Sequence, residues 1–288
     1  MKTRIATSVV GIAILIVVMN FFNTLVFDAA IALLALIGVH EAWSAVGYTK
    51  KEWYIYAGSI PAALLVLFIN QPGVMTLAMP IVGITAVGYA LLLVARSERF
   101  SFSQLSSYLL FSMVILYSFY SFIYLKYTFP VGSYRAEAMY FIILILCYAW
   151  GGDTFAYFAG RFFGRHKLAP IVSPKKTVEG AVGGVLGCVL LGEICTLVYL
   201  RVDEAGCAFF AHRSPVSFAL IIAGVGVVAA LLGILGDLFA SVIKRQHGIK
   251  DYGTIFPGHG GILDRFDSVM FVAVFISMMV RWMFNLIP

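Results

Sequence analysis

The part of the sequence with the clearest chemical potential is a charged connection between two apolar stretches, residues 241–267, which reads SVIKRQHGIKDYGTIFPGHGGILDRFD. Its basic side chains suit phosphate groups, and Asp264 and Asp267 offer the hard oxygen ligands that divalent cations prefer. Its glycines permit positive φ angles and closely spaced backbone N–H groups that bind anions. The connection therefore predicts a site that handles phosphates together with a metal ion.

A second candidate is an acid inside the apolar stretch that precedes this connection. Asp237 lies seven residues before Lys244, which places it roughly 10 Å below the end of its helix at about 1.5 Å per residue. Helical spacing stacks Asp237 with Ser241 and then with Lys244 and Arg245 in one polar stripe. A carboxylate within a bilayer normally has a partner or a function. Asp237 is therefore a candidate functional residue, and an intrahelical ion pair is the structural alternative.

A second polar cluster begins with Asp153 and Tyr157, near the end of another apolar stretch, and continues into KLAPIVSPKKTVEG, residues 167–180. In this stretch Ser173 and Pro174 break the chain before the polar residues Lys175, Lys176 and Thr177. A basic loop that fixes topology and caps a helix is the structural alternative. We expect this cluster and residues 241–267 to form two walls of one site on the same face of a membrane.

The elements that position these residues are expected to be transmembrane helices. Hydrophobic residues make up 61% of the chain and charged residues only 12%, and the mean hydropathy is +0.96. Soluble domains contain roughly 45–50% apolar residues. This composition predicts an all-α polytopic membrane protein and excludes a soluble globular domain.

Runs of about 20 apolar residues predict the individual spans. We expect nine of them, at residues 5–22, 25–46, 53–69, 75–95, 105–125, 139–159, 178–200, 216–240 and 268–286. Because the third run is short and the fifth is rich in aromatic residues and serines, eight or ten spans are alternatives. Within the second span, His40 and Glu41 are interpreted as an internal polar pair.

These spans are expected to form a single membrane-embedded domain, residues 1–288. Residues 1–138 would contribute five helices, and a catalytic half, residues 139–288, would contribute four spans and two cytoplasmic polar loops at 161–177 and 241–263. Lys and Arg gather in alternate loops, which predicts a cytoplasmic N-terminus and an external C-terminus. The four cysteines have no ligand-like spacing and indicate neither a zinc site nor a disulfide framework.

Residues 241–267 resemble the signature of the phosphatidate cytidylyltransferases, integral membrane enzymes also called CDP-diacylglycerol synthases. The matching residues of this signature are Ser241, Lys244, Arg245, Lys250, Asp251, Gly253, Pro257, His259, Gly260, Gly261, Asp264, Arg265 and Asp267. The resemblance extends upstream to Gly236, Asp237, Ser173, Pro174, Lys176, Thr177, Gly180, Trp150, Gly151, Asp153, Ala156 and Tyr157, and so covers the C-terminal half. The motif departs from the family's commoner residues at Gly152 and Phe155.

The resemblance implies transfer of CMP from CTP to phosphatidate, with CDP-diacylglycerol and pyrophosphate as products and Mg²⁺ as the required metal. It implies catalytic roles for Asp237, Lys244, Asp264 and Arg265, and metal ligation by Asp237, Asp264 and Asp267. Substrate binding is expected of Asp153, Tyr157, Ser173, Lys175, Lys176, Thr177, Ser241, Arg245, Lys250, His259, Gly260 and Gly261. A second metal ion is left open.

The expected partners are CTP, phosphatidate and membrane lipids, without nucleic acid, in a bacterial cytoplasmic membrane. A homodimer is left open, because glycines such as Gly180, Gly183, Gly184 and Gly187 allow close helix packing within or between chains. Two other functions compete with this one. A CTP-dependent kinase for lipid alcohols would need a base to deprotonate a hydroxyl, and a transporter of phosphorylated anions would favour related halves and charges near the bilayer midplane. The long signature match and the charges crowded on one face favour the transferase.

Overall fold

The computed structural model describes residues 2–71, 73–129, 135–202, 215–258 and 260–285. The chain divides into two compact units. The first comprises Met1–Tyr124 and Lys244–Arg265, and the second comprises Leu125–Ile243 and Phe266–Pro288. The charged connection that follows Ile243 therefore groups with the N-terminal helices.

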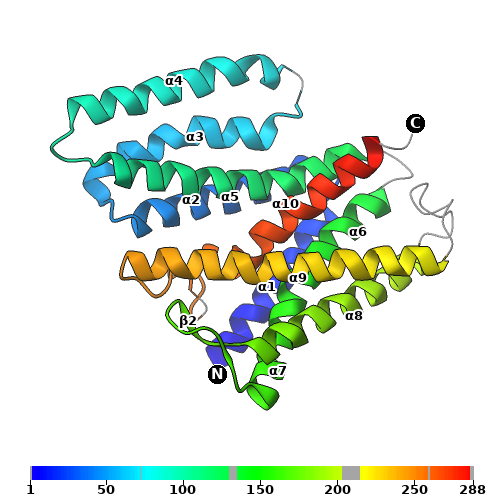
Figure 1. Ribbon diagram of the computed structural model, residues 1–288. Coiled ribbons are helices and arrows are strands. Elements are labelled where there is room, and N and C mark those ends of the chain that lie inside the picture. Colours follow the sequence, from blue (N-terminus) through cyan, green and yellow to red (C-terminus); the bar gives the residue numbers. More distant parts are fainter. Residues whose placement is uncertain (1, 72, 130–134, 203–214, 259, 286–288) are drawn as a thin grey trace. The chain divides into compact units, whose positions relative to one another are not determined.

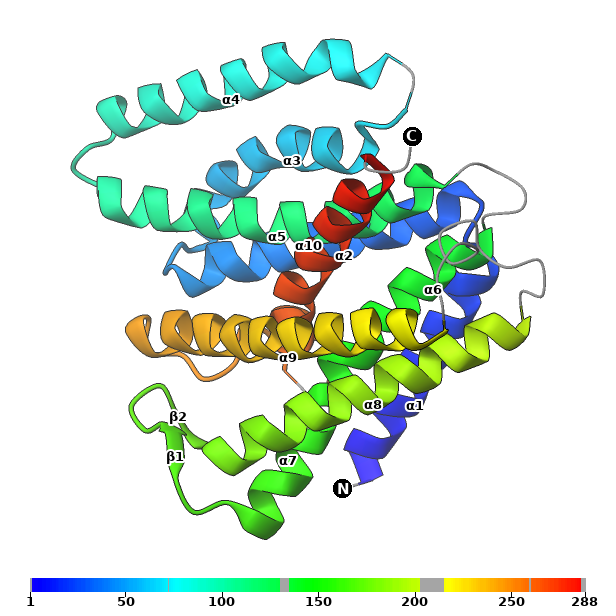
Figure 2. The same ribbon diagram turned by 45° about the vertical axis from the view of Figure 1, so that its right-hand side comes forward.

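The first unit is built from apolar helices, labelled in Figure 1. They are α1 (Lys2–Asn20), α2 (Leu25–Ala45), α3 (Trp53–Phe68), α4 (Val74–Ala95) and most of α5 (Phe102–Thr128), and the short charged 3₁₀ turn η1 (Lys50–Glu52) precedes α3. Helix α3 lies beside both α2 and α4 in both ribbon views (Figures 1 and 2). Consecutive helices that run side by side are what short connections between spans produce.

Tyrosine hydroxyls join the helices of the first unit in its interior. The Tyr89 hydroxyl on α4 donates to the Ile55 carbonyl on α3 at 2.6 Å. Ser59 on α3 and Tyr108 on α5 share a buried hydrogen bond of 2.5 Å. Helix α4 also exposes apolar side chains, with Met79 86% and Val94 78% exposed. An apolar helix face of this kind is stable against lipid chains and costly in water.

The second unit contains the remaining elements. They are α6 (Arg135–Leu146), the π-helical turn η2 (Cys147–Gly151), α7 (Gly152–Phe163), β1 (Lys167–Ala169), β2 (Ser173–Thr177), α8 (Val178–Val202), most of α9 (Pro215–Gln246) and most of α10 (Leu263–Asn285). The expected span at 139–159 is thus part of a longer helical segment with a π-turn in its middle. Turns of this type are frequent near functional sites.

Helices α7 and α8 lie side by side in both ribbon views and pack through glycines (Figures 1 and 2). A Cβ at Gly184 would lie 3.1 Å from the Ala156 Cβ and 3.2 Å from the Gly152 carbonyl oxygen. A Cβ at Gly160 would lie 2.8 Å from the Thr177 Oγ1. Small residues let two helix backbones approach this closely, which strengthens van der Waals packing in lipid. The small residues noted in the sequence therefore pack helices within one chain.

A β-hairpin connects α7 to α8, within the polar loop expected at 161–177. Its strands are antiparallel, with Lys167 opposite Thr177 and Ala169 opposite Ser173. Glu179, in the first turn of α8, accepts hydrogen bonds from the backbone N–H groups of Arg165 at 3.0 Å and His166 at 3.2 Å. The hairpin is therefore tied to the start of α8.

Six helices in the described part of the chain are long and apolar enough to cross a membrane. They are Leu25–Ala45, Val74–Ala95, Phe102–Thr128, Ala136–Phe163, Val178–Arg201 and Val216–Gln246. These helices confirm the prediction of a helical integral membrane protein. The count of nine spans, the orientation of the termini and the division at residue 138 remain predictions.

The glycine packing between α7 and α8 predicts a specific sensitivity to side-chain size. Gly183→Leu should lower the thermal unfolding midpoint in detergent, because a Cβ at this position would overlap the Ala159 Cβ. Overpacking typically costs about 1–3 kcal/mol. Gly88→Leu on α4 is the matched control, because a Cβ there meets no atom within 4 Å. Equal midpoints for the two variants would contradict the packing.

Candidate functional site

The connection between α9 and α10, residues 247–262, is here called the glycine loop. Three of its glycines have positive φ angles: Gly248 at 66°, Gly258 at 78° and Gly260 at 86°. Phe256 and Gly260 exchange two backbone hydrogen bonds, of 2.9 and 3.1 Å. Positive φ is unfavourable for residues with a Cβ, so these glycines permit the tight turn that brings the loop back to α10.

The Asp264 carboxylate is the centre of the polar contacts around this loop. Its Oδ1 accepts a hydrogen bond from Lys244 Nζ at 2.9 Å. Its Oδ2 accepts from the backbone N–H groups of Tyr252 at 2.7 Å and Gly261 at 3.0 Å. Only 3% of the Asp264 side chain and 11% of the Lys244 side chain are exposed. Asp264, a predicted metal ligand, and Lys244, a predicted phosphate-binding residue, therefore form a buried ion pair.

A residue that the sequence did not assign to the site supports the same loop. Glu41 on α2 is 3% exposed, and it accepts hydrogen bonds from the backbone N–H groups of Ile262 at 2.9 Å and Leu263 at 2.8 Å. The expected pairing of Glu41 with His40 is not what the structure shows. The His40 ring instead lies 5.3 Å from the Trp43 ring and 5.2 Å from the Tyr56 ring, centroid to centroid. The only feature of the sequence that could have indicated this role of Glu41 was its position as an acid near the end of an apolar run.

In the second unit, Asp237 forms the corresponding ion pair. Its Oδ2 lies 2.5 Å from Lys176 Nζ on β2, and its Oδ1 accepts a hydrogen bond from Ser241 Oγ at 3.2 Å. The Ser241 contact confirms the first step of the polar stripe expected from helical spacing, whereas Lys244 pairs with Asp264 and not with Asp237. The ion pair with Lys176 joins the hairpin to α9, so the lysine partner of Asp237 comes from another element and not from its own helix.

Two further acids of this unit meet at Ser268 on α10. Asp153 Oδ2 accepts a hydrogen bond from Ser268 Oγ at 2.9 Å, and Asp267 Oδ1 accepts from the Ser268 backbone N–H at 2.9 Å. Asp267 is 9% exposed, whereas Asp153 is exposed. The structure thus connects the motif on α7 with the start of α10.

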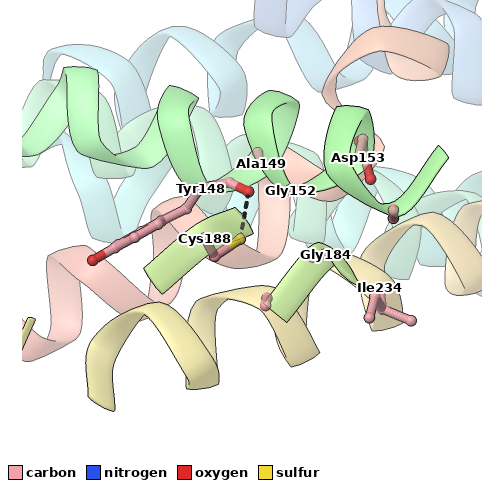
Figure 3. Close-up of a pocket in the computed structure, with 10 residues that line it drawn as sticks. Tyr148, Ala149, Gly152, Asp153, Gly184, Cys188 and Ile234 are labelled. Atoms are coloured by element: carbon pink, nitrogen blue, oxygen red, sulfur yellow. Dashed lines mark hydrogen bonds between the residues drawn. The ribbon is translucent and has the colours of Figure 1, made fainter. Parts of the chain in front are cut away.

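Asp153 also borders a small cavity in the second unit (Figure 3). Its other lining residues are Tyr148, Ala149, Gly152, Ala156, Gly184, Cys188, Ala230, Gly233 and Ile234. The space open to a water-sized sphere is about 20 Å³. Because one water needs roughly 10–15 Å³ by this measure, the cavity has room for about one water and none for a nucleotide.

The other predicted site residues lie around these two clusters. Arg245, Lys250 and Arg265 are exposed side chains of the first unit. In the second unit, Lys175 is exposed, Ser173 begins β2 and the Tyr157 hydroxyl accepts a hydrogen bond from Arg161 Nη1 at 3.1 Å. Thr177 Oγ1 accepts from the Gly180 N–H at 3.1 Å, so it caps α8. His259 lies outside the described residues.

The backbone amides expected to bind phosphate are engaged within the protein. The Gly260 N–H donates to the Phe256 carbonyl at 3.1 Å, and the Gly261 N–H donates to Asp264. Their role in substrate binding remains a prediction. The expectation that the two polar clusters form one site also remains a prediction, because Asp264 and Asp237 belong to different units.

Metal ligation by these carboxylates remains a prediction. Among the residues that the structure describes, no three His, Cys, Asp or Glu side chains converge as a metal-binding group. A carboxylate offers about four lone-pair positions, and the contacts given above occupy three on Asp264 and two on Asp237. By this count each acid has at least one lone-pair position that these contacts do not use.

Comparison with known proteins agrees with this site chemistry. A model of the cytidylyltransferase family matches residues 2–283. A phosphatidate cytidylyltransferase of Staphylococcus haemolyticus is 33% identical over 277 residues, which are 94% of this chain and 96% of that protein. One from Staphylococcus epidermidis is 32% identical over 276 residues, with the same coverage.

A shorter alignment gives a higher identity. A phosphatidate cytidylyltransferase of Staphylococcus saprophyticus is 40% identical over 179 residues, which are 62% of this chain and 60% of that protein. The family match and the near-full-length relatives extend across both units. The chain belongs to the cytidylyltransferase family of nucleotide-transferring enzymes.

Proposed function

We propose that this protein transfers CMP from CTP to phosphatidate and releases pyrophosphate, which makes CDP-diacylglycerol for phospholipid synthesis. The observation that carries the proposal is the family match over residues 2–283. Relatives named phosphatidate cytidylyltransferase also align over 94% of the chain. The apolar helices support a location in the membrane, where phosphatidate resides. The Staphylococcus relatives support a bacterial cytoplasmic membrane.

The reaction itself needs little proton transfer. An ionised phosphate oxygen of phosphatidate attacks the α-phosphorus of CTP, and the bond from that phosphorus to the β-phosphate oxygen breaks as pyrophosphate leaves with the electron pair. Because the nucleophile already carries a negative charge, no strong general base or covalent intermediate is required. Catalysis then depends on positioning two polyanions and on neutralising their charge.

The residues of the first unit are proposed to bind the phosphates of CTP. Lys244 is held by Asp264 beside the glycine loop, and its ammonium lies 5.3 Å from the centre of the Tyr252 ring. A cation fixed in this way is pre-oriented for an anionic ligand. The exposed Arg245, Lys250 and Arg265 are proposed to add charge for the triphosphate and the leaving pyrophosphate.

The residues of the second unit are proposed to bind the remaining polar groups of the substrates. Lys176 is paired with Asp237, and Lys175 on the same strand is exposed. Both are proposed to contact nucleotide or lipid phosphate, with Ser173 and Thr177 on the same strand. Asp153 and Tyr157 on α7 are proposed to orient substrate at the end of that span.

Mg²⁺ is the proposed cofactor. Asp237 and Asp264 would hold it, with Asp267 as a further ligand, because these carboxylates are hard oxygen donors. When bound, the metal would supply positive charge that offsets the phosphate charge as it develops. In the structure, Lys176 and Lys244 form ion pairs with the first two acids.

Separately labelled CTP tests the reaction directly. Purified protein with phosphatidate micelles and Mg²⁺ should move label from the cytosine base into chloroform-soluble lipid, and label from the γ-phosphate should stay in water. Arrival of the γ-phosphate label alone would make the protein a lipid kinase. A well-folded sample that transfers neither label would contradict both transferase activities and favour transport.

Asp264→Asn and Asp237→Asn should each lower kcat by at least about 100-fold, in the range seen when a group that stabilises transition-state charge is removed. The amide keeps the shape of the side chain but loses its negative charge. Lys51→Ala is the control, because Lys51 is an exposed residue of η1. If these variants are monodisperse and folded but have near-normal turnover, Asp264 and Asp237 are not the metal ligands.

Lys244→Ala should raise the KM for CTP, because it removes the buried cation proposed to meet the triphosphate. It also leaves Asp264 without its ion-pair partner, so the thermal unfolding midpoint must be measured alongside the kinetics. Initial rates over a range of CTP concentrations at saturating phosphatidate give the KM. An unchanged KM for CTP in a folded variant would assign Lys244 to the lipid or to structure.

A further inference from the structure

Glu41 occupies an unusual position for an acidic residue of an apolar helix. It lies four residues before the end of α2, which ends at Ala45, and it is 3% exposed. Insertion scales put the cost of an acid at the centre of a bilayer at about 2.5–3.5 kcal/mol, and such acids normally have a function. No part of the proposed reaction has yet used Glu41.

The contacts of Glu41 are all with one short stretch of backbone. Its two oxygens accept separate hydrogen bonds from the Ile262 and Leu263 N–H groups, more than two hundred residues away in the sequence. These are the last N–H groups before Asp264. An N-terminal helix cap usually comes from a neighbouring Ser, Thr, Asp or Asn, whereas here α10 is capped by a carboxylate from another span.

The glycine loop is shaped to admit this carboxylate. The three atoms nearest to a Cβ at Gly261 would be the carboxylate atoms of Glu41. The atom nearest to a Cβ at Gly253 would also be a carboxylate oxygen of Glu41. Neither glycine has a positive φ, so backbone conformation does not require glycine at these two positions. The absence of side chains there leaves space for Glu41.

Two carboxylates therefore hold the same turn. Glu41 binds the N–H groups of Ile262 and Leu263, while Asp264 binds those of Tyr252 and Gly261. Asp264 also holds Lys244. If the start of α10 shifted, the carboxylate of Asp264 and the ammonium of Lys244 would shift with it.

We propose that Glu41 is a positioning residue for cytidylyl transfer, which fixes the backbone before Asp264 and so the placement of the Lys244–Asp264 pair. This role rests on the proposed function. Glu41 itself does not touch the substrates. A displacement of about 1 Å at a reacting centre can cost about 100-fold in rate, so a distant acid can have a large effect on turnover.

Glu41→Gln tests the role with little change in shape. An amide has one acceptor oxygen, so one of the two backbone N–H groups loses its partner. We expect kcat to fall by at least about tenfold, within the range that misplacement of a reacting group produces, and the KM for CTP to rise less than in Lys244→Ala, because the Lys244 ammonium is displaced but still present. Hydrogen exchange should become faster in peptides that contain Ile262 and Leu263.

Glu52→Gln is the matched control. Glu52 also accepts a backbone N–H at the start of a helical turn, from Thr49 at 2.8 Å, but it belongs to η1 and is part of a capping box there. This variant should keep normal kcat and normal exchange at Ile262 and Leu263. A similar loss of kcat in both variants would indicate a general effect of lost caps and would overturn the proposal.

A double-mutant cycle probes the contact from the loop side and does not depend on the Gln variant folding. Gly261→Ala alone should lower kcat, because its new methyl group collides with the Glu41 carboxylate. In a Glu41→Ala background the same change should have little further effect, since the obstructing atoms are gone. If the losses of kcat from Gly261→Ala and Glu41→Ala simply add in the double variant, the proposed coupling between the two residues is overturned.

These outcomes separate the two proposals. Failure of the unaltered protein to transfer labelled CMP would contradict the proposed function. A transferring parent protein with a fully active Glu41→Gln variant would contradict the role of Glu41 alone. A Glu41→Gln variant that loses kcat only in proportion to a loss of folded protein would make Glu41 a structural residue, which also overturns the proposal.

Discussion

A carboxylate buried among apolar helices must find a cation or several N–H donors, and this requirement organises the polar parts of the structure. Asp264 meets it with one ammonium and two backbone amides. Removing one partner of a buried ion pair leaves an uncompensated charge, which typically costs about 3–5 kcal/mol. The path of the glycine loop follows from this constraint, because the loop must return to place the Tyr252 and Gly261 amides against the same carboxylate.

A weaker form of this constraint applies to the hairpin of the second unit. Asp237 lies within α9 with 24% of its side chain exposed, and its cation comes from Lys176 on β2. That strand can deliver a lysine only if the hairpin has a fixed position, which Glu179 supports by binding the Arg165 and His166 amides. The glycine packing of α7 against α8 sets the two helix ends from which the hairpin projects.

Local sequence patterns predicted the helices better than their contacts. Apolar run length placed α2 and α4 within one residue of their observed ends, because span length is set by bilayer thickness. The stripe from Asp237 to Ser241 was also predictable, since it depends only on helical spacing. The partners Lys176 and Glu41 were not, because hydrogen bonds between residues far apart in the sequence depend on tertiary packing. The hairpin was missed for a related reason: Pro174 and the short strands resemble a loop in sequence.

The glycine loop shows how an anion-binding backbone can serve the protein's own acids. Glycine-rich turns offer amides to phosphate, but the described amides at Tyr252, Gly261, Ile262 and Leu263 all donate to Asp264 or Glu41. Cations on exposed side chains such as Lys250 are then better placed than these amides to meet an arriving polyanion. A rigid inner layer that fixes the lysine and the carboxylate, with charged side chains outside it, suits a reaction that depends on positioning and charge neutralisation, because the inner layer has little reorganisation left to undergo when the substrates bind.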